Sequence, residues 1–155
     1  MNKWPLHRNR FTKDGYEKLK EEYEDLKTQR PSAVEDLKKA RDLGDLKENG
    51  YYKASRQRLS AIDSRMTHLS YNIKTAKIID GSETDNIGIG STVLFLINGN
   101  EKTYQFVGDL EANPSEGKLS LLSPIGRAVE GKKMGEEVEV RTPSGVVLYK
   151  IKNIS

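Results

Sequence analysis

The chain has 155 residues, of which 35% are hydrophobic and 32% are charged, and it contains two histidines and no cysteine. The absence of cysteine excludes a disulfide framework, a thiolate metal site and a cysteine nucleophile. No apolar run approaches the ~18 residues of a membrane span, and the first ten residues lack the apolar core of a signal peptide. We therefore expect a soluble, cytoplasmic protein that makes no membrane contact. The mean hydropathy of −0.72 is low and predicts either disorder or a large surface for the volume enclosed.

Charge divides the chain into two parts. Residues 1–79 hold 18 Lys/Arg and 12 Asp/Glu, a net charge of +6, whereas residues 80–155 hold 8 and 11, a net charge of −3. A basic first part and an acidic second part predict two domains with different partners.

Apolar residues in the first part recur at alternating steps of three and four, which is typical of a helix with a narrow apolar seam. One series runs from Tyr16 to Ala40 and the other from Tyr52 to Ala76. We predict two long helices over residues 12–43 and 45–79, and a connection this short allows only an antiparallel hairpin. A thin rod of this kind accounts for the low hydropathy without disorder. Pro31 removes a helical hydrogen bond, so we expect a kink or break beside it.

The segment between the two predicted helices reads RDLGDLKENGYY. Gly44 suits the left-handed end of the first helix, and Asp45 with Glu48 three residues later has the form of a capping box that opens the second. The same carboxylates are hard oxygen ligands, and Mg²⁺ is often held by one or two protein carboxylates plus water and phosphate. The residues alone leave both interpretations open.

Basic residues predominate in the distal half of the predicted hairpin. Residues 38–65 contain eight Lys/Arg and four Asp/Glu, whereas residues 12–36 contain five and eight. This distribution favours a position beside nucleic-acid phosphates, although a solvated coiled-coil flank has a similar composition.

The second part has the composition of a small sheet domain. Residues 80–90 are rich in Gly, Ser, Asp and Asn and are typical of a linker, and residues 123–129 can form a short helix capped by Ser123. Between turn clusters lie five segments rich in strand-forming residues, at 91–97, 102–107, 119–122, 137–142 and 146–151. We expect an antiparallel sheet with one short helix and no catalytic Ser/His/Asp set.

The run Gly44 to Asn49, followed by Tyr52, closely resembles the tip of the bacterial Gre transcript cleavage factors, the GreA/GreB family. Other segments match this family in order and spacing: Gly15 to Leu19, Arg30-Pro31, Arg41, Ala76 to Asp80, Ser123 to Ile125 with Arg127-Ala128, and Gly135 with Val138 to Pro143. The resemblance extends from about Phe11 to Ile151. The tip is nearer GreA, whereas residues 57–65 look nearer GreB, and we favour GreA.

The resemblance implies an α+β protein in which an N-terminal antiparallel coiled-coil hairpin (1–79) and a linker (80–90) precede an FKBP-like antiparallel-sheet domain (91–155). It implies a transcription elongation factor that binds bacterial RNA polymerase and passes its coiled coil through the secondary channel. There the factor stimulates the polymerase's own cleavage of backtracked RNA, rescuing arrested complexes without being an enzyme itself. The implied partners are RNA polymerase and the nascent RNA 3′ end, and we expect a monomer.

Individual roles transfer by motif match. Asp45 and Glu48 would hold a Mg²⁺ shared with the polymerase active centre, which the chain does not bind stably alone, and would orient the attacking water. The predicted RNA-binding residues are Arg41 and Arg56 from the family match, with Lys47, Lys53 and Arg58 added on charge. The predicted polymerase-binding residues are Ser123, Pro124, Ile125 and Arg127.

The tip departs from the family pattern at two positions, because Gly50 and Tyr51 stand where a small and then an acidic residue are usual. The alternative function is a non-cleaving regulator of the same channel, although such relatives carry more acidic tips. A prolyl isomerase would need an aromatic-lined pocket, which the few aromatic residues of the second part argue against. A coiled-coil chaperone or general nucleic-acid binder would not need carboxylates at the tip.

Overall fold

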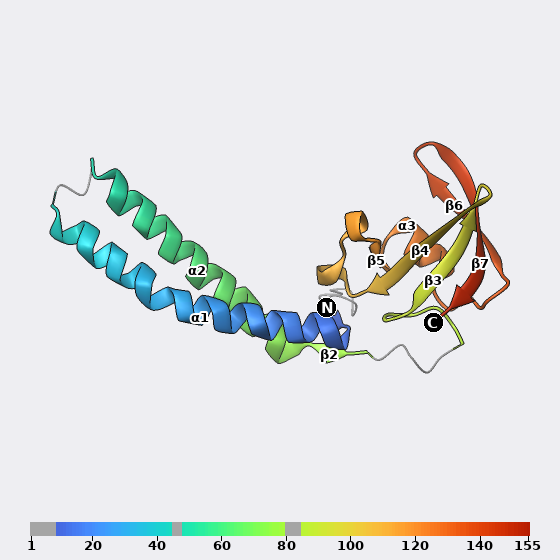
Figure 1. Ribbon diagram of the computed structural model, residues 1–155, viewed down its shortest axis with the longest axis horizontal. Coiled ribbons are helices and arrows are strands. Elements are labelled where there is room, and N and C mark those ends of the chain that lie inside the picture. Colours follow the sequence, from blue (N-terminus) through green and yellow to red (C-terminus); the bar gives the residue numbers. More distant parts are fainter. Residues whose placement is uncertain (1–8, 45–47, 80–84) are drawn as a thin grey trace, which may run out of the picture. The chain divides into compact units, whose positions relative to one another are not determined.

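The computed structural model describes residues 9–44, 48–79 and 85–155 (Figure 1). Contacts divide the chain into two compact units: a hairpin unit, Glu17–Thr75, and a sheet unit, which comprises Met1–Tyr16 and Ala76–Ser155. The domain boundaries that we predict from the sequence, at residues 79 and 90, stay a prediction.

The hairpin unit is built from helices α1 (Lys13–Asp42) and α2 (Gly50–Thr75), which run side by side (Figure 1). Glu22 near the start of α1 pairs with Arg65 late in α2, at 2.6 Å, so the helices are antiparallel. The predicted hairpin is confirmed. Burial is confined to a narrow seam whose buried positions are Ala33, Ala40, Ser55, Ile62 and Leu69.

Arg30 is the one polar residue in the predicted seam of α1, and it remains exposed. Its Nε donates to Oδ1 of Asp63 on α2 at 2.6 Å, and its Nη2 donates to Oδ2 of the same carboxylate at 3.3 Å. A bidentate pair of this kind fixes the orientation of both groups. The Arg30–Asp63 pair therefore helps to align α1 with α2.

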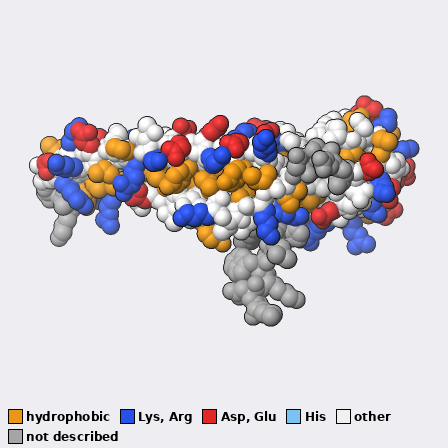
Figure 2. Space-filling model, turned by 90° about the horizontal axis from the view of Figure 1, so that it is seen from below, with side chains coloured by type: hydrophobic (Ala, Val, Ile, Leu, Met, Phe, Trp, Pro, Cys, Tyr) orange, Lys and Arg blue, Asp and Glu red, His pale blue; other side chains and the backbone are white. Residues whose placement is uncertain are grey.

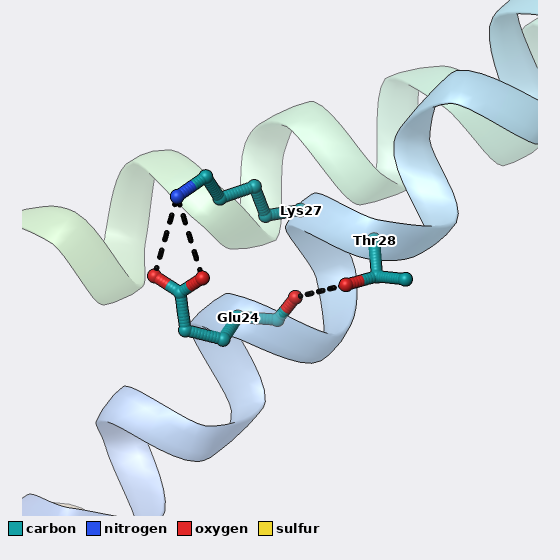
Figure 3. Close-up of polar contacts among 3 residues, drawn as sticks. All are labelled: Glu24, Lys27 and Thr28. Carbon is teal, nitrogen blue, oxygen red and sulfur yellow. Dashed lines mark hydrogen bonds and ion pairs between the residues drawn. The ribbon is translucent and has the colours of Figure 1, made fainter.

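Helix α1 continues through Pro31 and is not broken there, whereas the alternative that we predict, a kink, stays a prediction. Proline lacks an N–H, and the carbonyl of Lys27, four residues earlier, therefore has no amide partner there. The preceding turn makes its own side-chain contacts (Figure 3). Lys27 Nζ lies 3.3 and 3.5 Å from the two Glu24 carboxylate oxygens, and the Thr28 hydroxyl donates to the Glu24 carbonyl at 3.0 Å. Beyond the proline, the buried Ala33 packs in the seam, and this packing offsets the lost hydrogen bond.

Helix α2 ends at Thr75, four residues earlier than predicted. The chain then forms strand β2 (Lys77–Ile78), which pairs in parallel with β1 (Arg10–Phe11). Backbone hydrogen bonds flank the pair, from Lys77 N to Asn9 O at 2.6 Å and from Ile79 N to Phe11 O at 2.9 Å. The β-branched residues at 78 and 79 favour this extended backbone over a further helical turn.

The sheet unit contains a five-stranded sheet in the order β5-β4-β3-β7-β6. Its strands are β3 (Thr92–Ile97), β4 (Asn100–Val107), β5 (Lys118–Ser120), β6 (Glu137–Thr142) and β7 (Gly145–Ile154). The β4–β5 pairing is parallel and the other pairings within this sheet are antiparallel, so the sheet is mixed, not wholly antiparallel as predicted. Two short 3-10 turns, η1 (Asp109–Glu111) and η2 (Pro114–Glu116), reverse the chain between β4 and β5, which makes their parallel pairing possible.

One face of the sheet carries the hydrophobic core. The Phe95 ring is fully buried and meets Phe106 and Tyr149 edge to face, with centroids 6.3 and 5.5 Å apart. Helix α3 (Pro124–Val129) adds the buried Val129 to this core. These aromatic rings therefore fill the core.

The end of the predicted linker belongs to the folded sheet unit. Ile87 and Ile89 are buried in its core, and Asn86 forms a β-bridge with Lys133. In the sequence, the glycines and polar residues of 80–90 obscured this alternation of apolar residues, and Ile87 and Ile89 were not predicted as core residues. Residues 80–84 lie outside the described residues.

Glu111 fastens the start of α1 within the sheet unit. Thr12 donates its backbone N–H and its hydroxyl to the two carboxylate oxygens of Glu111, at 2.9 and 2.5 Å. The Thr12 hydroxyl oxygen also accepts the Gly15 N–H at 3.0 Å, which caps α1. One side chain from the 3-10 turn η1 thereby fixes the residue at which the first helix begins.

No helix in the described ranges has the length and apolar character needed to cross a membrane.

Glu22 tests what the interhelical ion pairs contribute. The hydrogen bond from Arg65 lowers the pKa of the Glu22 carboxyl, so the pair stabilises the fold above the unfolded-state pKa. This stabilisation is lost as the pH falls through the lower, folded-state pKa. Glu22→Gln should therefore reduce the free energy of unfolding at neutral pH by no more than about 1 kcal/mol, because the pair is half exposed, and the deficit should shrink below about pH 4.

Urea denaturation at neutral and acid pH measures this deficit. The matched control is Glu21→Gln, which changes an exposed carboxylate of the same turn that forms no ion pair with another described residue. A Glu22→Gln deficit that is the same at both pH values would contradict the assignment.

Candidate functional site at the hairpin tip

The first helix ends as its sequence predicts. Gly44 adopts the left-handed conformation, with φ of 74°, and its N–H donates to the Arg41 carbonyl at 3.2 Å. Glycine takes this conformation without strain. The Gly44 N–H thereby satisfies a carbonyl that has no partner inside the helix.

The second helix begins differently from the prediction. It starts at Gly50, and the Oδ1 of Asn49 accepts the Tyr52 N–H at 3.1 Å, as an N-cap does. The predicted capping box is wrong in placing Glu48 inside the helix, because Glu48 precedes it. Asparagine is among the strongest N-cap residues, and Asn49 takes that position in α2, while Asp45 of the predicted box lies outside the described residues.

Asn49 also contacts the first helix. Its Nδ2 donates to the Ala40 carbonyl at 3.1 Å, so one side chain joins the end of α1 to the start of α2. Asn49 was not among the site residues predicted from the sequence. Its position directly before a glycine at a helix start was the available signal.

Of the two predicted metal ligands, the structure describes only Glu48. Its side chain is exposed and forms no hydrogen bond to another described residue. Asp45 and Lys47 lie outside the described residues. No group of three or more His, Cys, Asp or Glu that could hold a metal occurs within residues 9–44, 48–79 and 85–155. A single exposed carboxylate fits a Mg²⁺ site to which a second macromolecule contributes most of the ligands.

The predicted RNA-binding residues on α2 differ in their surroundings. Lys53 and Arg56 lie together on one exposed face of α2, with Gln57, Ser60, Ala61 and Ser64. Arg58 is instead held by α1, because its Nη1 lies 2.7 Å from Oδ2 of Asp36. The structure therefore brings Lys53 and Arg56 together and directs Arg58 to the other helix.

Arg41, in the last turn of α1, is exposed and has no ion-pair partner in the part of the hairpin that the structure describes. Figure 2 shows one face of the molecule, on which a band of hydrophobic side chains follows the hairpin with basic and acidic side chains beside it. The charged side chains near the tip thus lie beside a narrow band of hydrophobic side chains.

The predicted docking segment forms the start of α3, in the sheet unit. The Ser123 hydroxyl accepts the Gly126 N–H at 3.1 Å and donates to the Ser120 carbonyl at 2.7 Å, so it is fully used as a cap. Ile125 packs against the core, whereas Pro124 and Arg127 are exposed. A Cβ on Gly126 would overlap the backbone of β5 and the residue after it, so this corner requires glycine.

Comparisons with known proteins agree with this architecture. Residues 9–78 match the family model described as transcription elongation factor, N-terminal, and residues 82–155 match the one described as transcription elongation factor, GreA/GreB, C-term. A protein of Bacillus licheniformis named transcription elongation factor GreA is 45% identical over 150 residues, which cover 94% of this chain and 95% of the relative. A protein of the same name from Nautilia profundicola is 42% identical over 154 residues, covering 96% and 95%.

Among solved structures, GreA factor homolog 1 of Thermus thermophilus is 27% identical, covers 94% of this chain and 97% of its own, and superposes with a TM-score of 0.44.

The two tip glycines should respond oppositely to alanine. Gly50 opens α2 without a left-handed φ and has no atom within 4 Å of an added Cβ, so Gly50→Ala should raise the free energy of unfolding by about 0.4–1 kcal/mol. Gly44→Ala forces a side chain into a left-handed conformation and should lower it by about 1 kcal/mol. Urea denaturation followed by circular dichroism measures both, and a Gly50→Ala variant less stable than the wild type would contradict the assigned helix start.

Proposed function

Since this chain belongs to the GreA/GreB family of transcription elongation factors, we propose that it binds bacterial RNA polymerase and stimulates the polymerase's cleavage of backtracked RNA. In this proposal the hairpin enters the secondary channel and places the tip carboxylates at the active centre. The chain contributes ligands and charge, and the polymerase performs the hydrolysis.

The observation that carries the proposal is the exposed Glu48 carboxylate at the end of two long helices. Helix α1 has 30 residues and α2 has 26, so each spans about 40 Å at 1.5 Å per residue. A rod of this length can carry a carboxylate deep into another macromolecule, whereas an isolated tip would bind a cation weakly. The position of the Glu48 carboxylate at the end of the hairpin and its incomplete set of metal ligands both favour a metal site shared with a second macromolecule.

Glu48, with Asp45 from the motif, would hold a Mg²⁺ shared with the polymerase. Such an ion, when bound, lowers the pKa of a coordinated water and stabilises charge at the phosphate. The exposed carboxylate of Glu48 is free of the hydrogen bonds within the described chain that would compete for it. The cations of Arg41 and Arg56 lie at exposed positions, where they can offset the charge of RNA phosphates.

The exposed Pro124 and Arg127 support a docking role for the start of α3. Because the Ser123 hydroxyl is already used in capping, Ser123 would act there by fixing the helix start and the shape of the corner.

Removing either tip carboxylate should abolish stimulation. Asp45→Ala and Glu48→Ala are each expected to lower the cleavage rate of a backtracked complex at least about tenfold, with polymerase binding retained. End-labelled RNA in a stalled complex with Mg²⁺ measures cleavage, and fluorescence anisotropy of the labelled factor measures binding. The matched control is Asp42→Ala, which removes an exposed carboxylate at the end of α1 that lies outside the motif.

Equal cleavage with the wild type and both variants would overturn the assigned role of the carboxylates. Binding of the wild type without any cleavage would favour the alternative, a non-cleaving regulator of the same channel.

Two arginines two residues apart in α2 separate RNA contact from hairpin stability. Arg56 is exposed on one face of α2, whereas Arg58 is paired with Asp36, so Arg56→Ala should weaken crosslinking to the RNA 3′ segment more than Arg58→Ala does. The Arg56→Ala loss should diminish as the salt concentration rises, because phosphate contacts are screened and exchange with counterions. Equal crosslinking by the two variants at every salt concentration would contradict this assignment.

A further inference from the structure

We propose that Asn49 is a positioning residue for the tip carboxylates: its side-chain amide ties the end of α1 to the start of α2 and so fixes the backbone that carries Glu48. This inference rests on the proposed function, because it concerns how the same tip is held in shape for the shared ion.

Within the described residues, Asn49 forms two hydrogen bonds with the first turn of α2 and one with the last turn of α1. Its Oδ1 accepts the Tyr52 N–H, its backbone carbonyl accepts the Lys53 N–H, and its Nδ2 donates to the Ala40 carbonyl, all at 3.1 Å. Ala40 is fully buried. Its carbonyl belongs to the last turn of α1, where no amide further along the helix is available, so the amide of Asn49 satisfies a group that would otherwise lack a partner.

Capping alone does not require asparagine. Serine, threonine and aspartate also accept the hydrogen bond of an N-cap. A carboxylate has no donor at neutral pH, and a serine hydroxyl is too short to reach another helix while it caps its own. Several residue types could therefore form the N-cap, but of these only asparagine can also donate a hydrogen bond to the Ala40 carbonyl.

The tip needs such a bond because its own backbone is permissive. Gly44 and Gly50 flank the connection, and glycine restricts the chain least of all residues. The ion pair between Asp36 and Arg58 lies about two helical turns below the tip. Within the described chain, the bond from Asn49 to the Ala40 carbonyl is thus the interhelical hydrogen bond nearest Glu48. It matters because a displacement of about 1 Å at a reacting centre lowers the reaction rate substantially.

Three variants separate positioning from stability. Asn49→Ser keeps the cap and loses the bond to Ala40, Asn49→Ala loses both, and Ile62→Val weakens the buried seam far from the tip. For each, the rate of RNA cleavage in a backtracked complex is measured at saturating factor as a function of Mg²⁺ concentration. Thermal unfolding and the affinity for polymerase are measured alongside.

Asn49→Ser should unfold at a temperature between those of the wild type and Asn49→Ala and bind polymerase normally, yet require about tenfold more Mg²⁺ for half-maximal cleavage, because a displaced carboxylate holds the shared ion less well. Asn49→Ala should show the same shift together with a lower unfolding temperature. Ile62→Val should lower the unfolding temperature and leave the Mg²⁺ dependence unchanged.

A wild-type Mg²⁺ dependence in Asn49→Ser, with cleavage by the wild type intact, would overturn this inference alone and leave Asn49 as a cap. A Mg²⁺ shift in Ile62→Val equal to that of Asn49→Ser would overturn it too, because the effect would then follow stability. Absence of cleavage by the wild type would overturn the proposed function and this inference with it.

Discussion

The hairpin depends on a seam that is only one side chain wide. Small residues such as Ala33 and Ala40 are fully buried there, while most of each helix faces water. Apolar contact along so narrow a strip gives little resistance to sliding of one helix past the other. Directed polar bonds between the helices, from the Glu22–Arg65 pair near one end to Asn49 at the other, fix the register. The proposed placement of the Glu48 carboxylate at the tip depends on this alignment of α1 with α2.

The hairpin was predictable because one periodic pattern dictates it. Steps of three and four place every seam residue on one face, and no tertiary information is needed to see that two such faces must meet. The cap of α3 was equally local, since Ser123 followed by Pro124 sets a helix start by short-range hydrogen bonding and a fixed φ. For the tip, the sequence correctly indicated the left-handed Gly44 at the end of α1.

What the sequence did not reveal depends on partners distant in the chain. Glu111 holds Thr12 across 99 positions, and nothing near either residue indicates the other. Ile87 and Ile89 look like linker residues until the core that covers them is present. Within the candidate site, Arg56 from the family match and Arg58 from its charge were both predicted to bind RNA, although Asp36 on the facing helix engages only Arg58. Local cap signals likewise favoured Asp45 over Asn49, whose second bond crosses between helices.

The proposed function places the hairpin tip beside the metal of the polymerase active centre. The chain has no cysteine, so Asp42→Cys at the end of α1 gives one site for a nitroxide label. Mn²⁺, which accepts the same oxygen ligands as Mg²⁺, replaces it in a backtracked complex. Electron spin resonance should show strong dipolar coupling between label and Mn²⁺, and none from a label placed instead at the exposed Ser115 of the sheet unit. A bound factor whose Asp42→Cys label shows no coupling would contradict the account.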